Sequence, residues 1–210
     1  MQTVKISTRY GVILGIIALI CTALSTAVYF LTKAPIEQAI AKQQAELLAQ
    51  IIPPQSYDND LLASCSQPDF AEAKTLRIEK ICIAEKNHQP VAYAYETIAP
   101  DGYSGNIRFL VGVTPQGEVL GLRVLEHKET PGLGDKIELR ISDWVLSFNQ
   151  QKISADNLNT WAVKKDGGQF DQFTGATITP RAIVNQLKRS ALPLIQQLNS
   201  IKEEPFNERK

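Results

Sequence analysis

The chain begins with a long apolar run, and the hydrophobic positions after it either alternate or recur at helical spacing. Residues 11–31 contain no charged side chain. As a helix they span about 30 Å, which is the thickness of the hydrocarbon layer of a bilayer. The run continues to Leu31 without the small-residue cleavage site that ends a signal peptide. The pattern therefore predicts an uncleaved transmembrane helix.

An amphipathic segment follows at 32–54 and ends at a pair of prolines, Pro53 and Pro54. Its apolar positions have helical spacing and are Ile36, Ile40, Leu47, Leu48 and Ile51. Two interpretations of this predicted helix are open. It is either a stalk that sets the following domain against membrane partners, or a helix that packs on the core of that domain.

The middle of the chain has the pattern of an antiparallel sheet. Strands are predicted at 76–84, 91–98, 107–113 and 118–125. Turn residues at 86–90 join the first two strands, and turn residues at 114–117 join the last two. Two consecutive hairpins of this kind form an antiparallel sheet.

Helical patterns dominate the last third of the chain. We predict a short helix at 137–148, a strand at 161–164 and a long helix with Thr179 as its N-cap and Pro180 as its first residue. The apolar positions of the long helix are Ile183, Val184, Leu187, Ala191, Ile195 and Leu198. The predicted fold class is therefore α+β: a single N-terminal transmembrane helix, then a domain with an antiparallel sheet and flanking helices.

The charged residues predict the orientation of the chain in the membrane and argue against nucleic acid as a partner. The chain has 22 basic and 22 acidic side chains, so we expect no nucleic acid partner. Lys5 and Arg9 precede the apolar run, whereas Lys33 and Lys42 after it are accompanied by glutamates. A short cationic N-terminus stays in the cytoplasm. We therefore expect everything after Leu31 to lie outside the inner membrane.

The cysteines and histidines suggest a candidate disulfide but no metal site. Cys65 and Cys82 are the candidates for a disulfide outside the cytoplasm, and a bridge of this span contributes about 3 kcal/mol. Two free thiols are the alternative, because spacing alone does not fix geometry. His88 and His127 have no cysteine or carboxylate at a recurring ligand spacing, so we predict no metal site.

The stretch Thr174-Gly-Ala-Thr177 stands directly before the last predicted helix. Thr179 suits the N-cap of that helix and Pro180 its first position. The N–H groups of a helix N-terminus favour a phosphate, and a threonine hydroxyl beside them is placed for a phosphoester. The alternative is an ordinary capped helix after a glycine turn.

A second glycine-rich stretch leaves the fourth strand and ends at Gly134. Pro131 makes Thr130 extended, and Gly132 and Gly134 allow a ligand to approach the backbone. With an apolar contact from Leu133, such a loop suits a flat ring. The alternative is a structural turn beside a solvated charge cluster, formed by Glu126, His127, Lys128 and Glu129.

Four motifs in order resemble the covalent FMN-binding domain family. They are Gly102-Tyr-Ser-Gly-Asn-Ile107, Leu125-Glu-His-Lys-Glu-Thr-Pro-Gly-Leu-Gly134, Lys165-Asp-Gly-Gly168 and Asp171-Gln-Phe-Thr-Gly-Ala-Thr-Ile-Thr179. With the N-terminal span, the chain is most similar to the G subunits of the Rnf (Rsx) ion-translocating electron-transport complex. The resemblance covers nearly the whole chain.

The resemblance implies that FMN is the cofactor and is bound covalently through its phosphate to Thr177. Thr174, Gly175 and Ala176 would then shape the phosphate seat. The residues that would line the flavin ring are Glu129, Thr130, Pro131, Gly132, Leu133 and Gly134. It also implies a flavin transferase that uses FAD during maturation, and sister membrane and redox subunits as electron partners.

The expected function is that of an electron-carrier subunit that couples electron transfer to ion translocation and does not turn over a soluble substrate alone. The alternatives are the C subunit of a sodium-translocating NADH:quinone reductase and a membrane-tethered FMN-binding regulatory module. The expected parts are a cytoplasmic N-terminus (1–10), the transmembrane helix (11–31), a stalk helix (32–54), a periplasmic FMN-binding domain (55–200) and a C-terminal tail (201–210).

Overall fold

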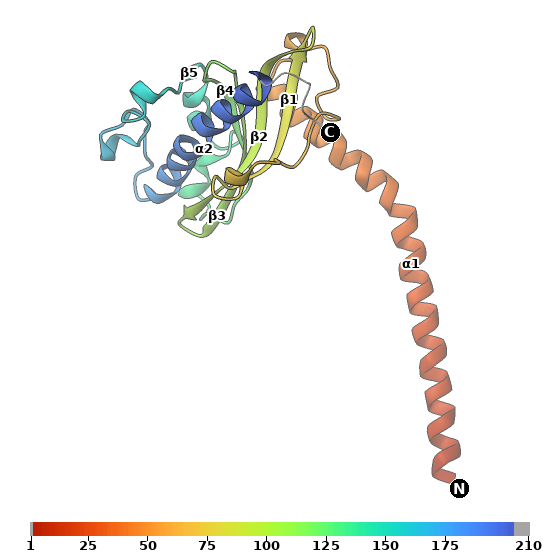
Figure 1. The fold of residues 1–210 in the computed structure, drawn as a ribbon. Coiled ribbons are helices and arrows are strands. Elements are labelled where there is room, and N and C mark those ends of the chain that lie inside the picture. The colour runs from red at the N-terminus through yellow and green to blue at the C-terminus, as the bar shows by residue number, and fades with distance from the viewer. Residues whose placement is uncertain (1, 204–210) are drawn as a thin grey trace. The chain divides into compact units, whose positions relative to one another are not determined.

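The structure, a computed structural model, describes the backbone of residues 2–203 and the side chains of residues 10–200 (Figure 1). Most of the expected C-terminal tail at 201–210 lies outside the described residues. The chain divides into two compact units, at 1–46 and 47–210. The first unit belongs to one helix, and the second holds the sheet and the remaining helices.

The N-terminal helix α1 (Gln2–Ile51) is continuous and passes through Pro35. The predicted apolar and amphipathic helices are therefore parts of one element. Its apolar part has a mean hydropathy of 2.4 in the most apolar window, and the helix is long enough to cross a membrane. Ion pairs one turn apart, Lys33–Glu37 at 3.9 Å and Lys42–Glu46 at 4.0 Å, mark its polar second half.

The predicted antiparallel sheet is confirmed, with one additional short strand. Its five strands lie in sequence order: β1 (Ile78–Lys86), β2 (Gln89–Gly102), β3 (Gly105–Val113), β4 (Glu118–Glu126) and β5 (Gln151–Lys152). Asn87 and His88 form the first turn, with φ of 52° and 61°. Both lie in the left-handed region that a two-residue hairpin turn requires, so His88 is a turn residue.

One face of the sheet is covered by the last helix, α2 (Ile178–Glu203), which crosses the strands in Figure 1. Its predicted apolar stripe is confirmed, because Ile183, Val184 and Leu187 are fully buried against the sheet. Hydroxyl groups of β2 also bind α2. These contacts are Tyr93 to Asn199 (3.1 Å), Tyr95 to Ser190 (3.1 Å) and Thr97 to Gln186 (2.8 Å).

The opposite face of the sheet is covered by the end of α1. Leu48, Ile51 and Ile52 are buried there together with small residues of β1 and β2. Gly112 and Gly121 pair directly across β3 and β4, and a Cβ on Gly112 would lie 2.2 Å from Cγ2 of Ile51. The last turn of the predicted amphipathic segment therefore packs on the domain core, whereas Ile36 and Ile40 further up the helix are exposed.

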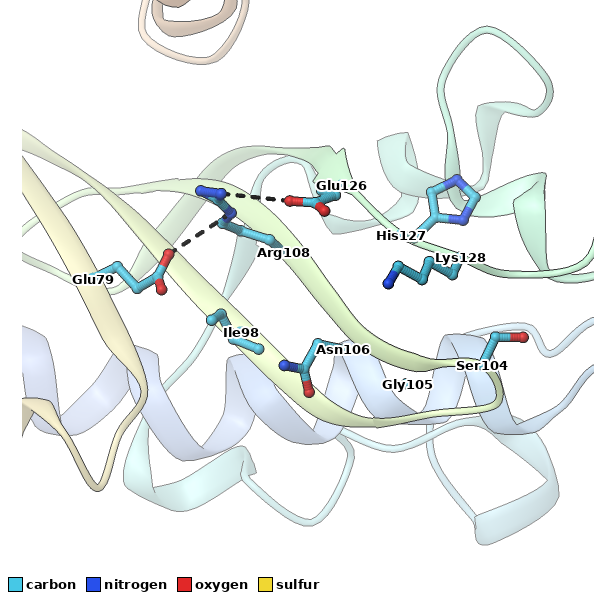
Figure 2. A pocket seen from close by; sticks show the side chains of 9 residues that line it. All are labelled: Glu79, Ile98, Ser104, Gly105, Asn106, Arg108, Glu126, His127 and Lys128. Atoms are coloured by element: carbon cyan, nitrogen blue, oxygen red, sulfur yellow. Dashed lines mark hydrogen bonds and ion pairs between the residues drawn. The ribbon is translucent and has the colours of Figure 1, made fainter. Parts of the chain in front are cut away.

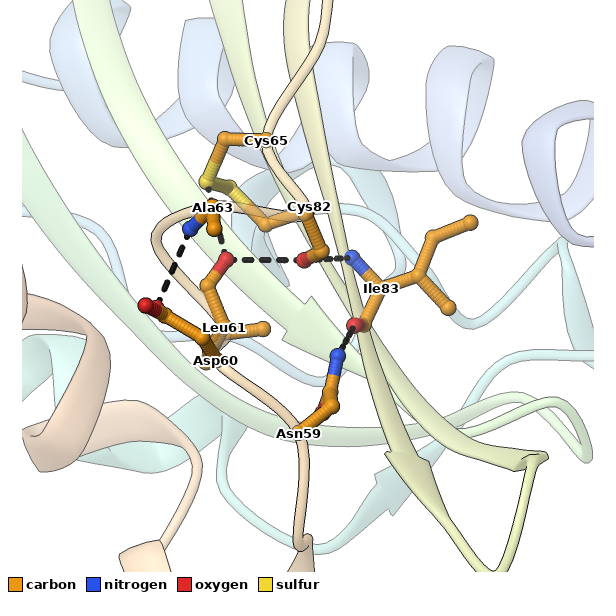
Figure 3. Close-up of a disulfide and its surroundings, with 8 residues drawn as sticks. Asn59, Asp60, Leu61, Ala63, Cys65, Cys82 and Ile83 are labelled. Atoms are coloured by element: carbon orange, nitrogen blue, oxygen red, sulfur yellow. Dashed lines mark hydrogen bonds between the residues drawn. A yellow bond between two sulfur atoms is a disulfide. The ribbon is translucent and has the colours of Figure 1, made fainter.

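A disulfide joins Cys65 to Cys82 on β1, with the two Cα atoms 4.0 Å apart (Figure 3). It belongs to a covering segment at 57–66 that runs along the outer edge of β1. Asn59 donates to the carbonyl of Ile83 at 2.9 Å, and Ser66 forms a bridge with Ile81. The free edge of the sheet is thus covered, which prevents edge-to-edge pairing with another chain.

The segment between β4 and α2 consists of short 3₁₀ turns rather than regular elements. The predicted helix at 137–148 is two such turns, Gly134–Ile137 and Asp143–Phe148, and the predicted strand at 161–164 is wrong. The other 3₁₀ turns of the domain are Pro54–Ser56, Ala71–Ala73, Ala155–Asn157 and Lys164–Asp166.

The apolar residues of this segment gather into one aromatic cluster. Its members are Trp144, Phe148, Trp161, Phe170 and Phe173. Trp161 is fully buried in the cluster, which explains why its strand-like neighbours do not pair with the sheet. Trp144 donates from Nε1 to the carbonyl of Asp171 at 2.8 Å. The cluster therefore supports the backbone just before the threonine motif.

Candidate functional site

The threonine motif forms a tight turn that leads directly into α2. The amide of Ala176 donates to the carbonyl of Phe173 at 3.1 Å, which closes the turn. Gly175 stands at its third position with φ of 80°, a conformation that glycine adopts without strain. Because the turn is closed by backbone bonds, its shape follows from the local sequence.

Thr177 is the N-cap of α2, which corrects the prediction that Thr179 caps the helix. The helix begins at Ile178, and the carbonyl of Thr177 accepts from the amide of Arg181 at 3.2 Å. Pro180 is consequently the third helical residue, where its missing N–H is harmless because the first turn has no internal partners. Thr177 therefore lies closer to the helix N-terminus than the sequence pattern indicated.

The four residues of this motif are accessible. Thr174 and Gly175 are exposed, and Ala176 and Thr177 are half-buried. The positive end of the α2 dipole lies beside the Thr177 side chain, so an anion bound there would be stabilised. The arrangement fits a phosphate group held at the helix N-terminus.

The second glycine-rich stretch, the loop at 127–134, forms a tight turn of the same kind. The carbonyl of Thr130 accepts from the amides of Leu133 and Gly134, both at 3.1 Å. Pro131 and Gly132 occupy the two central positions, and Gly132 has φ of 78°, as this turn type favours. Residues 130–133 are all exposed. The expected accessible loop is present.

The two turns lie against one another. A Cβ on Gly175 would be 3.8 Å from Cδ2 of Leu133. Leu133 of one turn is 43% exposed, and Ile178, the first residue of α2 after the other turn, is also 43% exposed. Tyr103, in the turn between β2 and β3, is 67% exposed. Three neighbouring segments, joined by the contacts of Ser104 with Glu129 and of Gly175 with Leu133, thus each expose an apolar side chain at the surface of the domain.

Two residues of the predicted set lie beneath this surface rather than on it. Glu129 is only 5% exposed, and Gly134 is buried. The Glu129 carboxylate accepts from the hydroxyl of Thr179 at 2.5 Å and from the amide of Ser104 at 3.0 Å. Sequence reasoning assigned no role to Ser104 and a different one to Thr179. Both belong to the motifs quoted above, but no spacing rule pairs them with Glu129.

His127 extends this buried network away from the surface. Its Nδ1 accepts from the amide of Glu129 at 3.0 Å, so its Nε2 carries the proton that is shared with Glu138 at 2.8 Å. A hydrogen bond from Arg140, with a further one from His127, keeps the pKa of Glu138 below its usual value. His127 and Glu129 are therefore structural, and the alternative of a solvated charge cluster is wrong for these two residues.

Cationic side chains near the threonine motif are held by acidic partners. Lys164 pairs with Asp171 at 2.6 Å, and Arg181 forms two bonds with Asp166 at 2.6 and 2.8 Å. The Arg181 guanidinium keeps the pKa of Asp166 below its usual range. The Arg181–Asp166 pair fixes the loop at 164–168 against the start of α2.

A shallow pocket of about 460 Å³ lies next to the site (Figure 2). Ser104, His127 and Lys128 stand at one end, and Glu79 at the other. Arg108 crosses the pocket and pairs with Glu79 at 3.7 Å and with Glu126 at 3.5 Å. Most of the lining residues are polar or charged, and Arg108, Glu79 and Glu126 pair with one another, so the exposed turns fit a flat apolar ring better than the pocket does.

The comparisons with known proteins agree with this geometry. The family described as FMN-binding domain matches residues 102–191, which include all three segments of the site. The class of protein is thus an FMN-binding domain behind an apolar N-terminal helix. The family described as RnfG N-terminal region matches residues 1–51.

Two relatives match this chain over nearly all of their own length. A protein of Pasteurella multocida, named as the G subunit of the ion-translocating oxidoreductase complex, is 61% identical over 95% of this chain and 98% of its own. A protein of the same name from Haemophilus influenzae is 59% identical over 95% of this chain and 99% of its own. The chain belongs to the family of G subunits of the ion-translocating oxidoreductase complex.

One solved structure, NqrC of Shewanella oneidensis, matches 72% of both chains with a TM-score of 0.47 and 19% identity. The relatives above carry the assignment, and they favour the G subunit over the C subunit alternative. The protein is accordingly a subunit of an ion-translocating oxidoreductase complex and contains an FMN-binding domain.

Proposed function

We propose that this chain is the electron carrier of its complex and holds FMN through a covalent phosphoester at Oγ1 of Thr177. The observation that carries the proposal is the position of Thr177 as the N-cap of α2, half-buried, at the end of a turn that contacts Leu133. A hydroxyl at a helix N-terminus is suited to a phosphate ester, because the dipole and the free amides favour the negative charge.

The other residues of the motifs have distinct tasks in this proposal. Thr174, Gly175 and Ala176 form the phosphate seat, and Thr130, Pro131, Gly132 and Leu133 form the accessible turn against which the ring lies. FMN bound there would supply transfer of one or two electrons. The protein contributes orientation: backbone turns that lack side-chain bulk, and apolar contacts that exclude water from one side of the ring.

Maturation requires a flavin transferase in this proposal. The Thr177 hydroxyl would attack the FMN phosphorus of FAD, the pyrophosphate bond would break with AMP as the leaving group, and the threonine proton would pass to a base of the transferase. The exposure of Thr174 and Gly175 beside Thr177 suits this reaction, because an enzyme must reach the hydroxyl on a folded substrate.

We place the domain on the periplasmic side of the inner membrane. The cationic N-terminus supports this orientation. The disulfide between Cys65 and Cys82 supports it independently, because such bonds persist in the oxidising periplasm and not in the cytoplasm. A reporter fused after Lys210 should be active only outside the cytoplasm, and activity inside would refute the orientation.

The covalent link is tested by flavin fluorescence of the denatured protein on a gel, after production together with a flavin transferase. Thr177→Val keeps the shape of the side chain and removes its oxygen, so we expect a folded protein without fluorescence. Thr174→Val is the matched control, because it makes the same change in the same turn and should retain the flavin. Loss of flavin in the Thr174 variant alone would move the link to that residue.

A further inference from the structure

Helix α2 is held to the sheet by polar contacts along its length. The hydroxyls of Tyr95 and Thr97 on β2 bind Ser190 and the side chain of Gln186. These contacts lie in the middle of the helix. At its first turn the contact comes from outside the sheet, from Glu129 in the loop at 127–134 to Thr179.

The Glu129 carboxylate is engaged at both oxygens. Oε2 accepts from the hydroxyl of Thr179 at 2.5 Å. Oε1 accepts from the amide of Ser104 at 3.0 Å. One side chain therefore connects three segments: the turn at 102–105, the loop at 127–134 and the start of α2. These are three of the four segments whose motifs carry the resemblance to FMN-binding domains.

The backbone packs tightly around this contact. A Cβ on Gly134 would lie 2.8 Å from Oε2 of Glu129 and 2.8 Å from Oγ1 of Thr179. A Cβ on Gly102 would lie 3.0 Å from Oε1 of Glu129. Glycine is thus required at both positions because of space. The carboxylate is enclosed by protein groups, and each of its two oxygens accepts a hydrogen bond from a protein donor.

We infer that Glu129 is a positioning residue and does not contact the flavin. Its carboxylate fixes the turn at 130–133 relative to Thr179, and hence relative to Thr177 two residues earlier. The inference rests on the proposed function, because its consequence concerns the flavin. Glu129 would keep a constant distance between the turn against which the ring lies and the residues that hold the phosphate. It reassigns Glu129 and Gly134, which the sequence placed on the ring, to the support beneath it.

The test uses the full chain with four variants. Glu129→Leu removes the carboxylate, and Thr179→Val removes the hydroxyl while keeping the side-chain shape. Thr179→Ser restores the hydroxyl and is the conservative rescue. Thr97→Val is the matched control, because it removes another buried hydroxyl that binds α2, at Gln186, away from the site.

The first readout is hydrogen exchange of the chain produced without flavin transferase. In Glu129→Leu we expect faster exchange at 103–105, 130–134 and 177–181 together, because one carboxylate binds all three segments. In Thr179→Val we expect faster exchange at 130–134 and 177–181, because the bond between Glu129 and Ser104 remains. Thr97→Val should leave these segments unchanged. If Glu129→Leu does not fold, the smaller change Thr179→Val still tests the inference. Unchanged exchange in that variant would overturn the inference.

The second readout is the extent of covalent flavin attachment when the transferase is present, normalised to folded protein. We expect Thr179→Val to lower the attachment rate about tenfold, the effect of losing a hydrogen bond to a charged group, and Thr179→Ser to restore it. Normal attachment in Thr179→Val would overturn the inference while leaving the proposed function intact. Absence of covalent flavin in the wild-type chain would instead refute the proposed function.

Discussion

Reduction of the disulfide is the perturbation whose effect on stability follows most directly from the structure. The bond joins residues 17 positions apart, and closure of a loop of that length in the unfolded chain corresponds to about 3 kcal/mol. For a domain of this size, 1 kcal/mol shifts Tm by about 2–4 °C. Reduction should therefore lower Tm by about 6–12 °C.

The assay is thermal unfolding of the full chain in detergent, with and without a reductant. Cys21 is the free cysteine among the described residues, so Cys21→Ser is the control and should show the same sensitivity to reductant as the wild type. The Cys65→Ala/Cys82→Ala variant should melt at the lower temperature in both conditions. Equal Tm values for oxidised and reduced wild type would refute the reasoning. They would show that the disulfide does not contribute to the stability of the domain.

Two further predictions concern the core and the acidic network. Ile183 is fully buried against the sheet, whereas Ile141 is 40% exposed. Ile183→Ala should therefore lower the free energy of unfolding by about 2–5 kcal/mol. Ile141→Ala should lower it by less than about 1 kcal/mol. Similar losses in urea titrations of the two variants would contradict the packing described. The pKa of Glu138 is lowered by Arg140 and His127, so the stability that Glu138 contributes is present above the usual glutamate pKa and is lost as pH falls through the lower folded value. Glu138→Gln should accordingly be less stable than the wild type at pH 7 by about 0.5–1 kcal/mol, and the difference should shrink as pH falls below the usual glutamate pKa. A difference that does not change with pH would show that the charge is not responsible.

The parts of the site that depend on neighbouring residues could be predicted from the sequence. Pro131 and Gly132 favour the turn at 130–133 because each prefers the φ angle that its position requires. Gly175 favours the turn at 173–176 for the same reason. The four main strands and the apolar stripe of α2 follow from periodicities that burial imposes. These features are local, so a single sequence contains them.

The parts that depend on distant contacts could not be predicted. Glu129 and Thr179 are 50 positions apart, and nothing in their spacing distinguishes a buried pair from two surface residues. The position of Thr179 before a proline suggested a helix cap. Its hydroxyl is instead engaged by Glu129, so the helix starts two residues earlier and Thr177 takes the cap.

The segment at 134–170 shows a second limit of the same kind. Its apolar residues recur at spacings that suit a helix or a strand, but their side chains are drawn into the aromatic cluster. Ser142 caps a new turn at Trp144, which interrupts the predicted helix. Tertiary packing therefore overrides the local pattern where large aromatic side chains are concentrated.

The central claim is that one hydroxyl, at the N-cap of α2, carries the flavin. Mass spectrometry of the tryptic peptide at 166–181 tests it most directly, because this peptide contains Thr174, Thr177 and Thr179 together. In protein isolated from cells that make the transferase, the account predicts a peptide heavier by FMN less one water, with fragment ions that place the addition on Thr177. A peptide with only the mass of its amino acids, or an addition on another residue, would contradict the account.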